Sequence, residues 1–177
     1  MTVTVSLRDL VDELQMLPNE STAYLNKVTG KIIALTDDIV AMAEIDNQIE
    51  EELEDVTGDV VNEAPDLEAA YYQEVKRVLA FDPDYLKLPS RFEIHEYEIM
   101  ERFCLSIPDG EVSDVLLGKI RGSGAFRRFK EAIYQYEIEN DWFQYRDEAY
   151  KEIAIAWLES KDIAYVDDMN RREQRAE

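Results

Sequence analysis

The spacing of apolar residues along the first 36 positions predicts a helix followed by a β-hairpin. The first stripe has the offsets of one helical face, and Ser6 stands where a capping side chain belongs. Two β-rich runs, 22–25 and 31–35, are joined by a short loop that ends in Gly30, as in hairpins with a left-handed glycine. An edge strand is expected from 3–5 or from 163–166. The helical stripe consists of Leu7, Leu10, Val11, Leu14 and Leu17.

Helical spacing dominates the rest of the chain. An acidic amphipathic helix is expected up to the break at 57–59, and a second helix, capped by Asp66, runs to Leu79. A proline-containing connector follows at 81–89. The stripe of the acidic helix consists of Met42, Ile45, Ile49, Leu53 and Val56. Later stripes predict helices over 94–104, 112–120, 125–136 and 142–158, and they include Tyr97, Val115, Phe126 and Tyr136.

These elements predict a predominantly α-helical α+β fold, in which an N-terminal helix and a β-hairpin precede a packed C-terminal helical half. The length favours a single domain over 1–177. Its expected parts are the helix and hairpin (1–36), an acidic helical segment with the connector (37–90), the C-terminal helical half (91–166) and a mobile tail (167–177).

The net charge of the chain argues against several classes of function. The chain has 177 residues with 40 Asp and Glu against 19 Lys and Arg, a formal net charge of −21. Such a chain repels both a phosphate backbone and an anionic membrane surface, so direct nucleic-acid backbone binding and membrane binding are not expected. A hydrophobic fraction of 46% is ample for a core. No signal-peptide pattern and no apolar run of about 20 residues is present, which favours a cytoplasmic protein.

The rare residues exclude several chemistries. Cys104 is the single cysteine and His95 the single histidine, so neither an internal disulfide nor a Cys/His zinc site can form. In one continuous helix these two residues would lie on opposite faces, nine positions apart. We therefore predict no catalytic residue, no metal and no cofactor, and we favour a non-enzymatic protein.

Several blocks of the second half resemble a known bacterial family. Glu96-Tyr97-Glu98-Ile99-Met100-Glu101-Arg102-Phe103, Gly124-Ala125-Phe126-Arg127-Arg128-Phe129-Lys130 and Trp142-Phe143-x-Tyr145-Arg146-Asp147-Glu148-Ala149 occur in that order, followed by Glu152-Ile153-Ala154-Ile155-x-Trp157. This succession resembles the uncharacterised protein family 0158, and the hairpin and Leu86-x-Leu88-Pro89 are similar to it as well. The resemblance implies a soluble, helical bacterial protein. It implies no activity, because none is established for the family.

A local excess of positive charge interrupts this acidic chain. From Lys119 to Lys130 there are five cations and no acidic residue, and we call this segment the basic island. Two glycines before a predicted helix start would leave backbone N–H groups free beside the cations, which suits a phosphate, a carboxylate or a partner. The alternative is that the island pairs with the acidic helix of its own chain or of a second copy. Its candidate binding residues are Lys119, Arg121, Gly122, Gly124, Arg127, Arg128 and Lys130.

Two further features have alternative interpretations. Trp142, Tyr145 and Arg146 would form either a platform for a base or peptide or part of a core stripe. The acidic run from Asp37 to Glu68 is either a solvated face or a mimic of DNA phosphates. Its candidate surface is formed by Glu50, Glu51, Glu52, Glu54 and Asp55.

The leading hypothesis is an acidic, cytosolic interaction protein with opposed acidic and basic surfaces, which binds a protein partner or associates with itself. The alternatives are a DNA-mimicking inhibitor of a nucleic-acid-binding protein, and a binder or enzyme that acts on a phosphate or other anionic ligand at the basic island.

Overall fold

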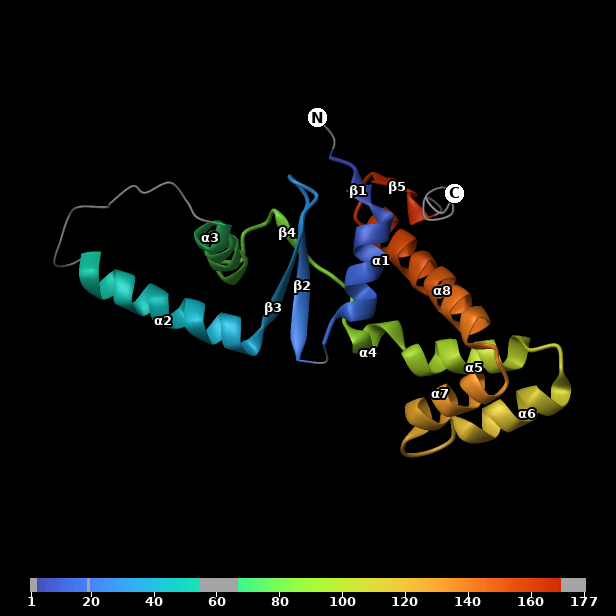
Figure 1. Cartoon of the computed structure of the whole chain (residues 1–177). Helices are drawn as coiled ribbons and strands as arrows, with labels where there is room; N and C mark the ends of the chain where they lie inside the picture. The colour runs from blue at the N-terminus through green and yellow to red at the C-terminus, as the bar shows by residue number, and fades with distance from the viewer. Residues whose placement is uncertain (1–2, 19, 55–66, 170–177) are drawn as a thin grey trace. The chain divides into compact units, whose positions relative to one another are not determined.

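A computed structural model of the chain describes residues 3–18, 20–54 and 67–169, without the side chains of residues 46–54 and 67–69 (Figure 1). The chain forms two compact units: residues 1–90 with 163–177 make unit 1, and residues 91–162 make unit 2. Each unit is described on its own, and the expectation of a single domain stays a prediction. Helices and a small sheet give the predicted, mainly helical α+β fold.

Unit 1 opens with the predicted helix. β1 (Val5–Ser6) leads directly into α1 (Leu7–Met16), and the Ser6 hydroxyl accepts a hydrogen bond from the Asp9 N–H at 3.1 Å. This side-chain cap satisfies one of the N–H groups that the first helical turn leaves unpaired. The apolar stripe is buried as predicted, with Leu7, Leu10, Val11, Leu14 and Leu17 each at most 3% exposed.

The hairpin is also confirmed. β2 (Ser21–Asn26) pairs antiparallel with β3 (Ile32–Thr36), and Gly30 has a φ of 73° in the connecting loop. The Asn26 side chain fixes the turn, because its Oδ1 accepts hydrogen bonds from the N–H groups of Val28 at 2.9 Å and Thr29 at 3.0 Å. A Cβ atom at position 30 would lie 2.8 Å from Val3 Cγ1, so both conformation and space favour glycine there.

The third strand of this sheet comes from an unexpected segment. β4 (Tyr85–Lys87), inside the predicted connector, pairs antiparallel with β2, and the strand order is β3-β2-β4. The predicted edge strands instead pair with each other: β1 and β5 (Tyr165–Val166) form a separate two-stranded parallel sheet. Both segments expected to supply an edge strand, 3–5 and 163–166, therefore contain strand residues, but these pair with each other and not with the hairpin. A three-residue strand is too short to show an alternating pattern, which explains why β4 was missed.

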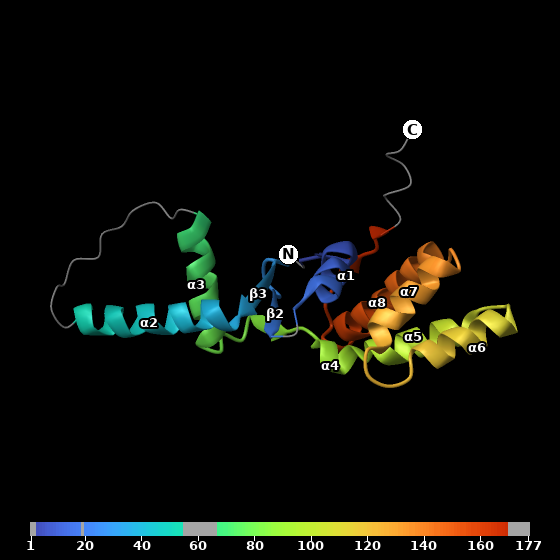
Figure 2. The same cartoon turned by 60° about the horizontal axis from the view of Figure 1, so that its bottom comes forward.

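Two helices pack against one face of the hairpin sheet. α2 (Asp37–Glu54) follows β3 without a loop, and α3 (Leu67–Leu79) precedes β4; Figure 2 shows both beside β3. The buried cluster between them consists of Ile33, Leu35, Ala43, Val75, Val78 and Tyr85. Because α2 starts at the end of a strand, the sheet sets its rotation, and Ile39, Val40 and Ala43 face the core.

Part of the stripe predicted for α2 is wrong. Met42 is 54% exposed and Ile45 is 56% exposed. The side chains of Ile49 and Leu53 lie outside the described residues, as do Val56, the break at 57–59 and the cap at Asp66.

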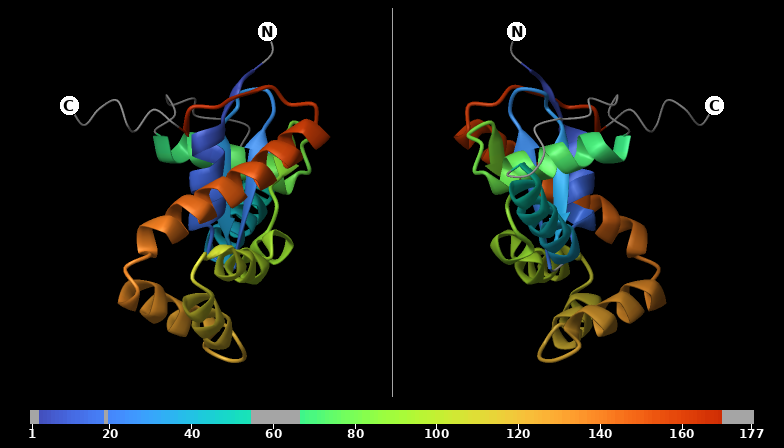
Figure 3. Two further views of the ribbon diagram at one scale, coloured as in Figure 1. Left: turned by 90° about the vertical axis from the view of Figure 1, so that its right-hand side faces the viewer. Right: turned by 90° about the vertical axis from the view of Figure 1, so that its left-hand side faces the viewer.

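Unit 2 consists of helices. α4 (Arg91–Ile94) and α5 (Glu96–Ser106) are separated by His95, which has a left-handed φ of 52°. The continuous helix assumed between His95 and Cys104 is therefore interrupted at the histidine. α6 (Gly110–Lys119), α7 (Ala125–Gln135) and α8 (Glu139–Ser160) follow, and the left panel of Figure 3 shows the loop between α6 and α7 at the foot of the picture.

The core of unit 2 is built around aromatic rings. Phe103 of α5 lies edge-on to Phe129 of α7 and to Trp142 and Tyr145 of α8, with ring centroids 5.3 to 6.1 Å apart. Phe129 and Trp142 are 4.8 Å apart in the same manner, a geometry that aromatic pairs prefer. Four residues of the predicted stripes lie outside this core: Tyr97, Val115, Phe126 and Tyr136 are 37–44% exposed.

Asp168, near the end of unit 1, forms hydrogen bonds with residues at the start of α1. Its carboxylate accepts hydrogen bonds from the Ser6 hydroxyl at 2.8 Å and the Arg8 N–H at 3.0 Å, although the sequence places it in the predicted tail. The Arg8 guanidinium donates in return to the carbonyls of Asp168, at 2.9 Å, and Met169. Burial alone would raise the pKa of Asp168, but these hydrogen bonds outweigh it and lower the pKa below its ordinary value.

Asp168→Asn is therefore expected to destabilise the protein by about 1 kcal/mol at pH 7, the usual value of a helix cap. Because the folded-state pKa is lowered, the carboxylate stabilises the fold above the unfolded pKa of about 3.9 and stops doing so as the pH falls through the folded value. The difference between wild type and variant should thus shrink as the pH falls below about 3.9 and be lost only below the folded-state pKa. Urea unfolding at pH 7 and pH 3.5 checks this, and an equal difference at both pH values would contradict it.

Candidate functional site

The basic island spans the end of α6, the loop 120–124 and the first half of α7. Gly122 and Gly124 both have a φ of 75°, the left-handed conformation that glycine adopts without strain. Gly124 is also the N-cap of α7 and supplies no capping side chain. The sequence expectation of glycines just before a helix start is therefore met by the structure, and the loop turns sharply between the two helices.

Arg128, itself part of the basic island, holds the loop 120–124 in place by hydrogen bonds to backbone carbonyls. Its Nε donates to the carbonyl of Lys119 at 3.0 Å, and its two terminal nitrogens donate to the carbonyls of Ser123 and Arg121. A guanidinium has five N–H groups in a planar fork, which suits such a set of acceptors. We call these three hydrogen bonds the Arg128 clamp. A Cβ atom at Gly124 would lie 3.3 Å from Arg128 Nη1, so the clamp also needs a small residue at position 124. Arg128 thus holds the loop together.

The same clamp orients backbone N–H groups outward. In a trans peptide the C=O and the following N–H point in opposite directions. Since the carbonyls of Arg121 and Ser123 point at the guanidinium, the N–H groups of Gly122 and Gly124 point away from it. Within the described part of unit 2 these N–H groups have no acceptor. They lie beside the start of α7, where the helix dipole also favours negative charge.

The other cations of the island are exposed. Among the residues that the structure describes, Arg127 pairs only with Glu131 on the next turn of α7, at 3.8 Å, and both side chains are more than two-thirds exposed. Such a pair is worth well under about 1 kcal/mol. No carboxylate among the described residues of unit 2 lies within 4 Å of the charged groups of Lys119, Arg121 or Lys130. The island therefore carries positive charge that unit 2 leaves almost unneutralised.

The second candidate set, Trp142, Tyr145 and Arg146, is placed differently. Trp142 is 5% exposed and packs on Phe103, so its ring offers no exposed face to a base or peptide. Arg146 Nε donates to Glu96 Oε1 at 2.9 Å, and its guanidinium lies 4.9 Å from the centre of the Tyr150 ring. Arg91 donates to the other Glu96 oxygen at 2.8 Å. This half-buried network joins α4, α5 and α8, and three positions so far apart in sequence gave no signal of it.

The remaining candidates are a buried cysteine, an exposed histidine and acidic residues whose side chains lie outside the described part of the chain. Cys104 is fully buried, and burial raises the pKa of its thiol to about 11, so it is not a thiolate at neutral pH. His95 is exposed. The acidic surface of Glu50, Glu51, Glu52 and Glu54 has no described side chains, and Asp55 lies outside the described residues. The DNA-mimic alternative, which depends on them, stays a prediction.

The described residues contain no group of three or more His, Cys, Asp or Glu side chains arranged to hold a metal ion. Of the helices in the described part of the chain, none combines the length and the apolar character that crossing a bilayer requires.

Comparison with known proteins identifies the family. The sequence model of the uncharacterised protein family UPF0158 matches residues 39–175, well over half of the chain. The chain belongs to this family. The resemblance of its second half is thereby confirmed. Both the basic island and the aromatic core lie inside the matched region. The family description names no activity, so it assigns no role to any residue.

Among curated proteins, a UPF0158 protein of Pseudomonas aeruginosa is 28% identical over 100 residues. The aligned region covers 56% of this chain and 61% of that relative, so the chain spans about three fifths of the relative's length. No solved structure matches this chain significantly.

Proposed function

We propose that this protein is a non-enzymatic interaction protein whose basic island binds an acidic protein segment. The observation that carries the proposal is the Arg128 clamp, which uses one cation of the island to expose backbone donors beside the others. Carboxylates bind well to such a set of cations and N–H groups. A chain with a net charge of −21 has little other reason to concentrate five cations without an acidic residue.

An acidic segment of suitable composition is present in the protein itself. Residues 37–68 contain thirteen acidic residues and no Lys or Arg. In α2, Met42 and Ile45 are exposed beside Glu44, and in α7 Phe126 and Tyr134 are exposed beside the cations. Both charge and apolar surface are thus complementary between the two helices. The partner tested first is therefore the acidic segment of a second copy.

Binding of a labelled peptide with the sequence 37–56 to the full-length protein tests the proposal. At low salt we expect saturable binding that weakens at least tenfold in the double variant Arg121→Glu/Arg127→Glu, because the variant reverses two exposed cations. About 0.5 M NaCl should abolish it by screening.

The matched control is Lys87→Glu/Lys161→Glu, which changes the net charge equally at two exposed lysines outside the island. Equal loss in both double variants would reduce the effect to net charge and overturn the proposal, as would the absence of peptide binding. The anion-binder alternative predicts a different result, namely that millimolar inorganic phosphate displaces the peptide at constant ionic strength.

A further inference from the structure

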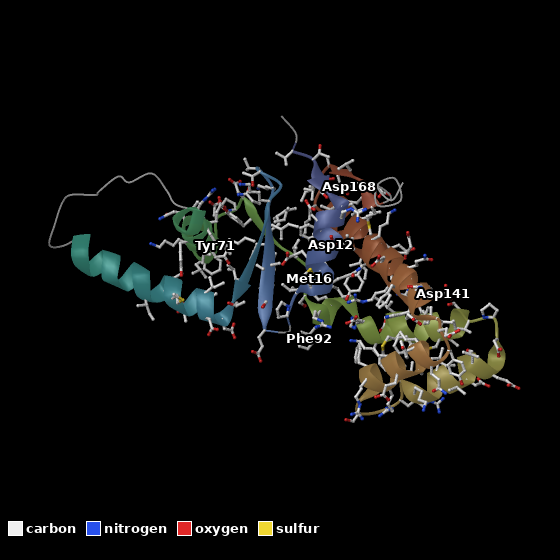
Figure 4. The ribbon with its side chains drawn as sticks, in the orientation of Figure 1. Asp12, Met16, Tyr71, Phe92, Asp141 and Asp168 are labelled. Atoms are coloured by element: carbon white, nitrogen blue, oxygen red, sulfur yellow. The ribbon has the colours of Figure 1, made fainter. Side chains whose placement is uncertain are left out.

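A small cavity lies in unit 1, between the hairpin sheet and α3. Its volume is about 240 Å³. Lys31, beside β3, and Asn26, Ile33 and Tyr85, on the strands, line one side, while Ala70, Tyr71 and Glu74 of α3 line the other. Figure 4 shows Tyr71 on α3, where its hydroxyl donates a hydrogen bond to the Ala34 carbonyl of β3 at 2.8 Å. This bond fixes α3 to the sheet beside the cavity.

The register of the sheet explains how these residues meet. Asn26 and Tyr85 are directly paired in the β2–β4 ladder, so both side chains lie on the same face. Ile33, paired with Tyr24, points to that face as well and belongs to the same buried cluster as Tyr85. On α3, positions 70, 71 and 74 share one side of the helix.

The wall of the cavity contains a buried polar group without a partner. Tyr85 is 8% exposed, and its hydroxyl has no hydrogen-bond partner among the described residues. Such a group costs about 1–3 kcal/mol and usually has a structural or functional reason. The Tyr85 ring is held in place, because the Arg77 guanidinium lies 5.2 Å from its centre. Asn26, 2% exposed, adds a second buried polar side chain.

The cavity has one cation and one anion at its lining. Lys31 is exposed and Glu74 is half-buried, and in the described part of unit 1 no salt bridge joins them. Apart from the amide of Asn26, the rest of the lining is apolar or aromatic. The lining thus supplies an ammonium group that can bind a carboxylate, a carboxylate that can bind an ammonium group, and an apolar surface.

We propose that this cavity binds a small zwitterion with an apolar body, the class of the free apolar α-amino acids. Lys31 takes the carboxylate, Glu74 takes the ammonium group, and the apolar body packs against Ile33 and Ala70. Size agrees with this class: 240 Å³ is below the range of drug-sized ligands and holds roughly eight water-sized groups at about 30 Å³ each. The basic island is in unit 2, so this proposal is independent of the proposed function.

Titration calorimetry and thermal unfolding of the full-length protein test the proposal with L-leucine and L-phenylalanine. We expect at least one of them to raise Tm and release or absorb heat at concentrations up to about 10 mM, since a ligand specific for the folded state stabilises it. Leucine is then compared with 4-methylpentanoate, which lacks the ammonium group, and with 3-methylbutylamine, which lacks the carboxylate. Both analogues should bind at least tenfold more weakly.

Three variants locate the site. Lys31→Gln and Ala70→Phe, at two exposed positions of the lining, should each abolish binding, the first by removing the cation and the second by filling the space. Lys87→Gln, an exposed lysine of β4 outside the lining, should bind as wild type does. Unfolding of each variant without ligand verifies that it folds. Absence of binding for both amino acids, equal binding of the analogues, or undiminished binding by Ala70→Phe would overturn the proposal.

Discussion

Phe103→Ala is expected to lower the free energy of unfolding by about 3–5 kcal/mol, which is the usual cost of deleting a buried phenyl ring. Phe103 is 2% exposed and contacts three other rings, from α7 and α8. Its loss removes buried apolar area and leaves a cavity that three separate helices cannot easily close. Urea unfolding followed by tryptophan fluorescence measures the effect, because Trp142 lies 5.3 Å from the Phe103 ring.

Phe143→Ala is the matched control. Phe143 is on α8, one residue from Trp142, but is 54% exposed. The same chemical deletion at this position is expected to cost under about 0.5–1 kcal/mol. Comparable losses for Phe103→Ala and Phe143→Ala would show that unit 2 is not organised around the described ring cluster.

Glu96→Ala is expected to have the second-largest effect, about 2 kcal/mol. Glu96 accepts hydrogen bonds from Arg146 at 2.9 Å and Arg91 at 2.8 Å, and the side chains of Glu96 and Arg146 are only 12% and 19% exposed. Removing the carboxylate takes a half-buried acceptor away from both guanidinium groups, and this costs more than the loss of an exposed pair. Chemical denaturation at neutral pH measures it.

Glu98→Ala separates this effect from the helix dipole. Both glutamates are in the first turn of α5, but Glu98 is exposed. If the network is the cause, Glu98→Ala should cost no more than about 0.5 kcal/mol, and the double variant Glu96→Ala/Arg146→Met should be more stable than Glu96→Ala alone. A double variant less stable than Glu96→Ala would argue against an uncompensated charge.

The parts of the fold that could be predicted from sequence are those determined locally. Ser6 and the leucine stripe define α1, and Gly30 between two β-rich runs defines the hairpin. A helix that buries one side has apolar residues at regular intervals in its sequence, and a tight turn often contains a glycine. The fold class followed from these signals, together with the succession of helical stripes in the second half.

The parts that could not be predicted depend on distant partners. β4 is a strand because β2 offers it an edge, and the strand expected at 163–166 pairs with β1 and not with the hairpin. Asp168 caps a helix that begins 161 positions earlier, at Leu7. The exposure of Met42 follows from the rotation that β3 imposes on α2. None of these relations leaves a periodic pattern.

The basic island also has features that the sequence predicts and features that only the folded structure shows. Its charge could be read from the sequence, as could the glycines before α7. The sequence could not separate the role of Arg128 from that of its neighbour Arg127, because only the folded loop brings three carbonyls to one guanidinium.

The pairing of β1 with β5 also affects the order in which the protein folds during synthesis. Val5 and Tyr165 are partners, so β1 must wait for 160 further residues, or about 8–30 s at 5–20 residues per second. The aromatic cluster of unit 2 is contained within residues 103–145 and can assemble before then. In chain order, the residues of the aromatic cluster therefore become available to pack together before β1 has its partner strand.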